Sequence, residues 1–255
     1  MNPCHIDLVL YRGLSELRAE ASRSYLGIIW WVMEPLLYVG VFYLVFESGL
    51  RRGGEGFVPY LLCGLVPWKW FDGTVRAASI VVASSVGLMR QLYVPKYLLP
   101  LAVIVTNTLK FGIILVILLG FMKLYGYPVF TSALLYLPLL LLVQLLLTLA
   151  ISGVAAALVP LLPDLRYVVN YGMTMLFFLS GIFFSLDDMS AEAQQLLMWN
   201  PMLLVIDAYR SILIDSAAPS LAHLSAVAGG SVLGLALAVW LFKHFDRVYP
   251  RVIGG

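Results

Sequence analysis

Residues 133–159 read ALLYLPLLLLVQLLLTLAISGVAAALV, a run of 27 residues without a charged side chain. A helix needs about 20 mostly apolar residues to cross the hydrocarbon core of a bilayer. Five further runs are also long and mostly apolar: 26–46, 58–86, 100–122, 167–185 and 224–242. These runs are continuous, whereas barrel strands alternate apolar and polar residues, so helices are expected. The sequence therefore predicts an all-α integral membrane protein with six transmembrane helices in a single domain, residues 1–255.

The composition of the whole chain agrees with a membrane location. Of its 255 residues, 62% are hydrophobic and 12% are charged, and the mean hydropathy is +0.94. Soluble domains average roughly 45–50% apolar and about 25% charged residues. A formal net charge of +2 is too small to indicate a nucleic-acid partner. Cys4 precedes the first span and Cys63 lies within the second, so no disulfide is expected.

The run at 58–86 is too long for one straight helix across a bilayer. Gly64 and Pro67 predict a break or a tilt within it. Lys69, Asp72 and Arg76 follow at i, i+3 and i+7, which places them on one helical face. We expect this charge ladder to pair within the helix and to face the bundle or a wet cavity, because lone charges in hydrocarbon are costly.

The distribution of Lys and Arg predicts the orientation, because cytoplasmic flanks of membrane helices are enriched in both. With the N-terminus inside, nine of the sixteen lie on the cytoplasmic side: Arg12, Arg18, Arg23, Arg90, Lys96, Arg166, Lys243, Arg247 and Arg251. Four lie outside: Arg51, Arg52, Lys123 and Arg210. Both termini are therefore expected in the cytoplasm.

Two segments outside the runs are amphipathic. Residues 5–22, within a segment 3–23, predict a helix that lies in the cytoplasmic interface with its polar face outward. Residues 186–222 predict two short helices outside the membrane. Ser190 caps the first, and Asn200 with Pro201 begins the second, which is too short to span alone. We expect a re-entrant hairpin or an external lid there.

Two of the runs carry stripes of aromatic residues at helical spacing. The stripe of the first run comprises Trp31, Glu34, Tyr38, Phe42 and Phe46. The stripe of the fifth run comprises Tyr167, Tyr171, Thr174, Phe178 and Gly181, with Phe177 and Phe184 close beside it. An interfacial belt, which would suit Trp30 and Trp31, and plain core packing are the alternatives. Two such stripes in a bundle of six helices indicate that they line a path.

The connector between the second and third runs has the charged and aromatic residues expected of a docking surface. Residues 87–100 read GLMRQLYVPKYLLP and hold Arg90, Gln91 and Lys96 between two hydrophobic helices. A second stiff and charged turn lies at 160–166. The sequence has no GxxxxGK[ST] motif, so it predicts no ATP site on this chain. Its histidines and acids show neither metal-ligand spacing nor a nucleophile motif, so an autonomous enzyme is not expected.

Four ordered blocks identify a family. They are RSYLGIIWWVMEPLLY at 23–38, LLCGLVPWKWFDG at 61–73, GLMRQLYVPKYLLPL at 87–101 and WNPMLLVIDAYR at 199–210. With these blocks the chain resembles the membrane subunit of ABC-2 type exporters, in the branch that exports lipid-linked O-antigen polysaccharide. Val94 departs from the family pattern, which often has Phe before the proline, and the change is conservative.

The resemblance implies a homodimer joined to two ABC-type ATPase subunits in the bacterial cytoplasmic (inner) membrane. It implies no cofactor on this chain, since ATP and Mg belong to the partner subunit. Segment 87–99 becomes the main coupling helix, and the turn at 160–166 becomes a lesser contact. The coupling residues expected from this resemblance are Arg90, Gln91, Tyr93, Pro95, Lys96, Asp164 and Arg166.

The resemblance also implies that the first and fifth spans of both copies line a polymer channel, with the short helices at 186–222 gating its exit. The channel residues are then Trp30, Trp31, Glu34, Tyr38, Phe42, Tyr167, Tyr171, Phe177, Phe178 and Phe184. The external gate residues are Trp199, Asn200, Pro201, Asp207, Tyr209 and Arg210. Aromatic rings suit a sugar polymer because apolar sugar faces stack on them without fixing a register.

The predicted function is therefore the channel-forming subunit of an ATP-driven exporter of lipid-linked polysaccharide. A capsule or teichoic-acid exporter of the same architecture is an alternative that differs in substrate alone. An ion-coupled lipid or glycan flippase is an alternative of another class, which rests on Glu34, Asp72 and Lys110. A membrane glycan-processing enzyme is disfavoured by the missing catalytic residues.

Overall fold

The computed structural model describes residues 11–19, 22, 27, 29–44, 56–85, 87, 95–186, 189–246 and 249. Within these ranges every regular element is a helix, which confirms the all-α class. The elements are α2 (Ile29–Tyr43), α3 (Phe57–Ser84), α5 (Leu98–Leu124), η2 (Ser132–Tyr136), α6 (Leu137–Leu158), α7 (Leu165–Leu179), α8 (Ala191–Leu197), α9 (Pro201–Leu213) and α10 (Leu221–Phe245).

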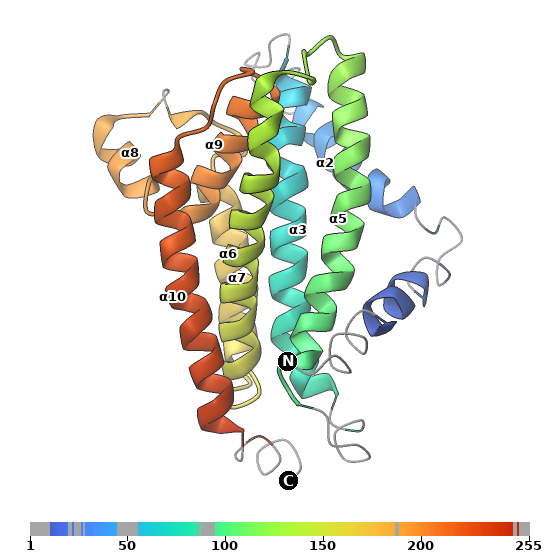
Figure 1. The fold of residues 1–255 in the computed structure, drawn as a ribbon, viewed down its shortest axis with the longest axis vertical. Helices are drawn as coiled ribbons and strands as arrows, with labels where there is room; N and C mark the ends of the chain where they lie inside the picture. The colour runs from blue at the N-terminus through green and yellow to red at the C-terminus, as the bar shows by residue number, and fades with distance from the viewer. Residues whose placement is uncertain are drawn as a thin grey trace.

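The long helices run along the long axis of the molecule, with α3 near the centre (Figure 1). α3 packs against α5, α6 and α9, and α6 packs along α10. The end of α3, the start of α5, the turn between α6 and α7 and the end of α10 lie at the lower end in Figure 1. The helices that flank both predicted docking connectors therefore meet at one end of the bundle.

The apolar core surrounds the first half of α3. Residues 61–68 of this helix are all buried, and they belong with buried residues of α6 and α9 such as Leu140 and Ile206. A stretch that is hydrophobic all round is the kind that a bundle encloses. Farther along the helix Gly73 and Ile80 are exposed. The enclosed first half makes α3 the scaffold against which the other helices are placed.

α3 runs through Gly64 and Pro67 without interruption, so the predicted break is wrong, and the alternative of a tilt stays a prediction. A proline inside a helix removes one backbone hydrogen bond and usually kinks or ends it. Here Gln144 Nε2 of α6 donates to the Pro67 carbonyl at 2.9 Å, and the residues on both sides are buried. The carbonyl that Pro67 leaves without a helical donor is that of Cys63, one turn earlier, so the Gln144 contact is additional and the surrounding buried packing is what supports this turn of α3.

Small residues allow α6 and α10 to approach closely. A Cβ atom at Gly153 would lie 2.9 Å from Ala238 Cβ, and one at Gly234 would lie 3.1 Å from Ala150 Cβ. Both distances are shorter than an ordinary contact between Cβ atoms, so a side chain at either glycine would press against an alanine of the other helix. Glycine and alanine at such crossings are typical of helices that associate in membranes.

Three helical segments among the described residues are long and apolar enough to cross a membrane: Leu98–Leu124, Ser132–Leu158 and Leu221–Phe245. The number rises to four if α8 and α9, which meet at 104°, form one broken span. α2 and α7 have 15 residues each. At ~1.5 Å per residue each covers about 22 Å of a hydrocarbon core that is about 30 Å thick. The six-span topology stays a prediction.

Residues 11–19 form a helical part of the predicted interfacial segment, and the rest of that segment lies outside the described residues. Gly13 is buried against α5, where Thr106 Oγ1 donates to the Gly13 carbonyl at 3.2 Å. A Cβ atom at Gly13 would lie 3.1 Å from a Val105 methyl carbon. This helix therefore packs on α5 through its glycine and leaves Tyr11 and Arg18 exposed.

Candidate functional site

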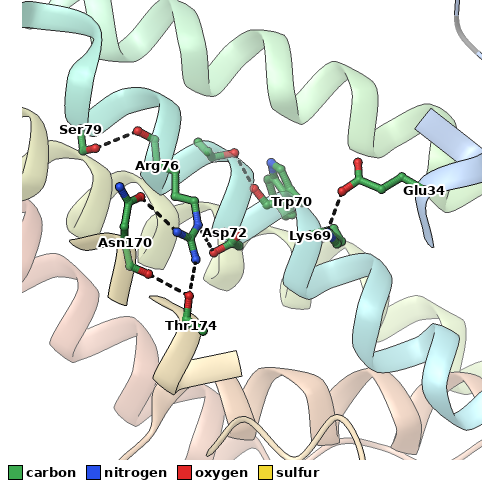
Figure 2. A network of polar contacts seen from close by, with 9 residues as sticks. Glu34, Lys69, Trp70, Asp72, Arg76, Ser79, Asn170 and Thr174 are labelled. Atoms are coloured by element: carbon green, nitrogen blue, oxygen red, sulfur yellow. Dashed lines mark hydrogen bonds and ion pairs between the residues drawn. The ribbon is translucent and has the colours of Figure 1, made fainter. Parts of the chain in front are cut away.

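A network of polar contacts extends from the charged face of α3 to two neighbouring helices (Figure 2). Arg76 Nε donates to Asp72 Oδ1 at 2.7 Å, so one contact of the predicted ladder within the helix is present. Lys69 takes a different partner. Its Nζ donates to Glu34 Oε1 of α2 at 2.7 Å. The ladder therefore pairs partly within α3 and partly between helices.

Lys69 makes two contacts with α2, one turn apart. Besides the ion pair with Glu34, its ammonium lies 3.9 Å from the centroid of the Tyr38 ring. The Glu34 carboxylate is thus neutralised by a cation, although its side chain is 52% exposed. Trp31 of the same helix is only 9% exposed, and Lys110 Nζ of α5 lies 5.5 Å from its ring centroid. Cations from α3 and α5 together position α2.

Arg76 makes the corresponding contacts with α7. Its Nη1 donates to Asn170 Oδ1 at 3.0 Å, and its Nη2 donates to Thr174 Oγ1 at 3.2 Å (Figure 2). The Thr174 hydroxyl donates in turn to the Asn170 carbonyl at 3.0 Å. A planar guanidinium with several donors is suited to bridging two acceptors on one helix face.

A polar pocket of about 200 Å³ lies between α2, α3 and α5. Its polar lining residues are Glu34, Lys69, Asp72, Asn107 and Lys110, with Trp31 among the apolar ones. A water molecule occupies about 30 Å³ of liquid, so the pocket has room for several. Water there would lower the cost of holding four charged groups within an apolar bundle.

The predicted channel residues divide by exposure. Six are exposed on α2 and α7: Trp30, Glu34, Tyr38, Tyr167, Tyr171 and Phe178. Trp31 is buried, and Phe177 and Phe184 pack against the core, with the Phe177 ring centroid 5.8 Å from that of Trp68. Phe46 and the side chain of Phe42 lie outside the described residues. Some of the predicted channel residues are therefore exposed at the surface, and the others pack beneath them against the core.

α7 ends earlier than the predicted fifth span. The helix stops at Leu179, so Gly181 and Phe184 follow it and do not continue its stripe. Gly181 has φ +68°, in the left-handed region that favours glycine. Asn200 Nδ2 donates to the Leu179 carbonyl and to Ser180 Oγ, both at 3.1 Å. Polar contacts from the start of α9 thus satisfy the end of α7.

Four of the predicted coupling residues are described, and they flank the lower end of the bundle: Pro95, Lys96, Asp164 and Arg166. Arg90, Gln91 and Tyr93 lie outside the described residues. Lys96 is buried, and its Nζ donates to Asp246 Oδ1 at 2.6 Å and to the Asp246 carbonyl at 2.7 Å. Pro95 is half-buried. The Lys96 side chain therefore joins the start of α5 to the end of α10.

The turn between α6 and α7 presents its charges to the surroundings. Asp164 and Arg166 are both exposed. Arg166 Nη2 donates to the Tyr167 hydroxyl at 2.6 Å, and its guanidinium carbon lies 4.6 Å from the centroid of that ring. This turn is an accessible basic and acidic surface beside the start of the α7 stripe.

Tyr249 links the chain after α10 to α6. Its hydroxyl donates to the Ala157 carbonyl at 2.9 Å, and the side chain is fully buried. Burial and, second, the nearby Asp246 carboxylate raise the pKa of Tyr249 to about 12. The phenol therefore stays protonated and keeps donating. With Lys96–Asp246, this contact ties α5, α6 and α10 together at the lower end.

The two predicted short helices before the last span are present as α8 and α9. Ser190 Oγ accepts from Ala193 N at 3.4 Å, and Asn200 Oδ1 accepts from Met202 N at 3.0 Å, which confirms both predicted caps. The two axes meet at 104°. Trp199, at the bend, is 87% exposed.

The predicted gate residues at the end of α9 have an internal role. Arg210 is only 7% exposed, and it donates to the carbonyls of Gly181 at 2.7 Å and Ile182 at 3.0 Å. Its guanidinium carbon lies 3.5 Å from the centroid of the Tyr60 ring. The fully buried Tyr209 hydroxyl donates to Gln144 Oε1 at 2.7 Å. These side chains fix α9 to α3, α6 and the end of α7.

The other gate residues lie nearer the surface. Asp207 is exposed, Pro201 is half-buried at the start of α9, and Asn200 is engaged with the end of α7. The gate set therefore contains an accessible part, with Trp199 and Asp207, and a buried part that anchors it.

The sequence patterns did not predict two residues that form hydrogen bonds at the site. Asn170 binds Arg76, and Gln144 links Pro67 with Tyr209. Each is an amide within a mostly apolar helix. Such side chains commonly form hydrogen bonds between membrane helices, so their position in an apolar run is a signal that could have found them.

The chain belongs to the ABC-2 type transporter family, whose family model matches residues 15–214. It is 30% identical over 256 residues to the O-antigen export system permease protein RfbA of Myxococcus xanthus, which covers 97% of this chain and 98% of that protein. It is 22% identical over 209 residues to a protein of the same name from Klebsiella pneumoniae, with 82% and 81% covered. The resemblance drawn from the four sequence blocks is thus confirmed.

Replacement of Arg210 by Lys should destabilise the protein. An ammonium cannot reproduce the fork that joins two consecutive carbonyls, and a buried acceptor left without its hydrogen bond costs about 1–3 kcal/mol. We expect the melting temperature of the purified protein in detergent to fall by about 2–10 °C. Arg166→Lys is the matched control, since Arg166 is exposed, and should melt like the parent. Equal melting temperatures for both variants would show that Arg210 does not anchor α9.

Proposed function

We propose that the chain is the membrane subunit of an ATP-driven exporter that moves lipid-linked polysaccharide of the O-antigen type across the bacterial cytoplasmic membrane. The observation that carries the proposal is 30% identity, over 97% of this chain, to a protein named as an O-antigen export system permease. The exposed aromatic faces of α2 and α7 support it, because they suit a sliding sugar polymer. A capsule or teichoic-acid polymer would use the same surfaces.

In this proposal two copies of the chain form a homodimer with six spans each, and α2 and α7 of both copies line the path. Tyr38, Tyr167 and Tyr171 contact the polymer directly. Trp31 and Phe177 shape the same faces from behind. The bent α8–α9 pair gates the exit, with Trp199 on its accessible part.

The lower end of the bundle in Figure 1 faces the cytoplasm in this proposal. Both termini lie on the cytoplasmic side, as the distribution of Lys and Arg predicts. Two copies of an ABC ATPase subunit, which bind ATP and Mg, dock there against residues 87–99 and the turn that holds Arg166. The lysine and arginine excess of these segments supports this orientation. The link from Lys96 to Asp246 connects that surface to α10.

An ion-coupled flippase is less well supported. That alternative rests on membrane acids that can exchange protons. Glu34 and Asp72 instead lie 2.7 Å from the nitrogen atoms of Lys69 and Arg76. Both carboxylates are therefore occupied by cations of α3, which leaves them poorly placed to take up a coupling ion. The contacts of both acids therefore favour a transport cycle that is driven by ATP on a partner.

Inactivation of the partner ATPase should abolish export. Inverted membrane vesicles that contain the complete complex should translocate the polysaccharide on addition of ATP. Vesicles whose ATPase carries a substituted phosphate-binding lysine should not. A protonophore should leave ATP-driven translocation unchanged. Translocation that survives ATPase inactivation and stops with the protonophore would contradict the proposal.

Reversal of charge at Arg166 should weaken ATPase docking without affecting the fold. Arg166 is exposed, and its described contacts are to Tyr167, next in the chain. Arg166→Glu should reduce co-purification of the ATPase subunit by about three- to tenfold, since rim charges contribute modestly to association. Lys123→Glu, at the other end of α5, is the control and should co-purify normally. Lys96→Glu is unsuitable, because the new carboxylate would face Asp246. Undiminished co-purification of Arg166→Glu would exclude this turn from the docking surface.

Truncation of Tyr171 should impair export of long polymers. Tyr171→Ala removes an exposed ring from α7 that has no role in the core. We expect surface polysaccharide to become shorter and roughly two- to tenfold less abundant, given about 0.5–1.5 kcal/mol per aromatic contact. Trp240→Ala removes an exposed ring from α10, outside the proposed path, and should export normally. If the length distributions of both variants match the parent, the α7 stripe does not contact the polymer.

A further inference from the structure

The two helices with exposed aromatic faces are both attached to α3 by the same kind of contact. Glu34 and Tyr38 of α2 are four residues apart, and both contact the Lys69 ammonium. Asn170 and Thr174 of α7 are four residues apart, and both accept from the Arg76 guanidinium. Residues at i and i+4 lie on one helical face, one turn apart. These two helices, α2 and α7, are called the wall helices below. Each of them thus offers a two-point contact to one cation of α3.

A two-point contact fixes how a helix is rotated about its own axis, whereas a single point leaves it free to turn. Apolar packing also acts on these helices. Trp31 of α2 and Met173 of α7 are buried, and Val169, Leu176 and Phe177 of α7 pack against the core. Glu34, Tyr38 and Thr174 are themselves members of the two stripes. The contacts to α3 therefore act on the faces that carry the aromatic rings.

Lys69 and Arg76 are seven residues apart on α3, which is about 10 Å along the helix axis. They share one helical face, with Asp72 between them and paired to Arg76. The first half of α3 is enclosed by the core, so the orientation of this helix is fixed by packing. The position of one wall relative to the other is thus set through a single rigid helix.

These contacts can separate more readily than a packed apolar interface. The Lys69 and Glu34 side chains are 21% and 52% exposed, and the polar pocket of about 200 Å³ lies beside them. An ion pair that water can reach contributes only modestly to stability. A wall helix attached in this way can turn or shift while α3 and the core stay unchanged.

We propose that Lys69 and Arg76 are positioning residues for export, which hold the aromatic faces of α2 and α7 toward the path through separable contacts. The inference rests on the proposed function, in which these two helices line that path. The residues act through Glu34, Tyr38, Asn170 and Thr174 and need not touch the polymer.

Charge exchange between α2 and α3 tests the first contact. Glu34→Lys and Lys69→Glu each bring like charges together, and each should lower export of polysaccharide by about threefold or more. The double variant Glu34→Lys/Lys69→Glu re-forms the pair with its sign reversed and should restore most of the export. Lys69→Arg, which keeps the charge, should export close to the parent level. Failure of the double variant to recover, with the complex intact by size-exclusion chromatography, would overturn the inference.

A labelling experiment measures wall orientation without any transport. Single cysteines replace exposed residues in a background without Cys4 and Cys63: Val41 on α2, Met175 on α7 and, as a control, Leu221 at the start of α10. In Lys69→Glu the rate of reaction with a soluble maleimide should change at Val41→Cys, and in Arg76→Gln it should change at Met175→Cys, by about threefold or more. Leu221→Cys should react at the parent rate in both. A merely structural loss would alter the rate at all three sites, or at none, and would overturn the inference.

The two experiments separate this inference from the proposed function. Labelling changes confined to α2 and α7 support the positioning role even if the parent protein exports no polysaccharide, in which case the proposed function fails. Normal export by Lys69→Glu and Arg76→Gln, with unchanged labelling, overturns the positioning role and leaves the proposed function intact.

Discussion

Three charged side chains in the middle of α3 set a condition that the surrounding helices must meet. Lys69, Asp72 and Arg76 belong to a helix whose other residues are largely apolar and buried. A charge in such surroundings needs a counter-charge, hydrogen bonds or water. α2 supplies Glu34, and α7 supplies Asn170 and Thr174. This requirement acts on the placement of both helices beside the apolar packing of residues such as Trp31 and Met173.

Local patterns in the sequence predicted the helical class, the ranges of the long helices and the caps at Ser190 and Asn200, because these depend on neighbours within a few residues. They also placed the three charges of α3 on one face. The partner of Lys69 could not be predicted in this way. Asp72 was the nearer acid along the chain, whereas the observed partner, Glu34, lies 35 residues earlier. Pairing between helices depends on how they pack, and a helical period carries no information about that.

The same limit explains why the predicted site residues divided into exposed and buried groups. Arg210 was predicted at an external gate from the family resemblance, yet its guanidinium binds two carbonyls beyond the end of α7. Lys96 was predicted on a docking surface, yet it binds Asp246, which is 150 residues away. In both cases a long basic side chain is buried in the protein and donates hydrogen bonds to oxygen atoms of another segment. Composition alone cannot distinguish such an anchor from a surface charge.

The contacts of α3 also have an order in time, because a chain is synthesised from its N-terminus. Glu34 precedes Lys69, so the partner of that lysine is already present when α3 emerges. Asp72 and Arg76 lie on one helix turn and neutralise each other from the start. Asn170 and Thr174 come almost a hundred residues later, and they add uncharged hydrogen bonds to a cation that is already paired. Each charge of α3 thus has a counter-charge available before the rest of the bundle exists, so biogenesis of the helix need not wait for α7.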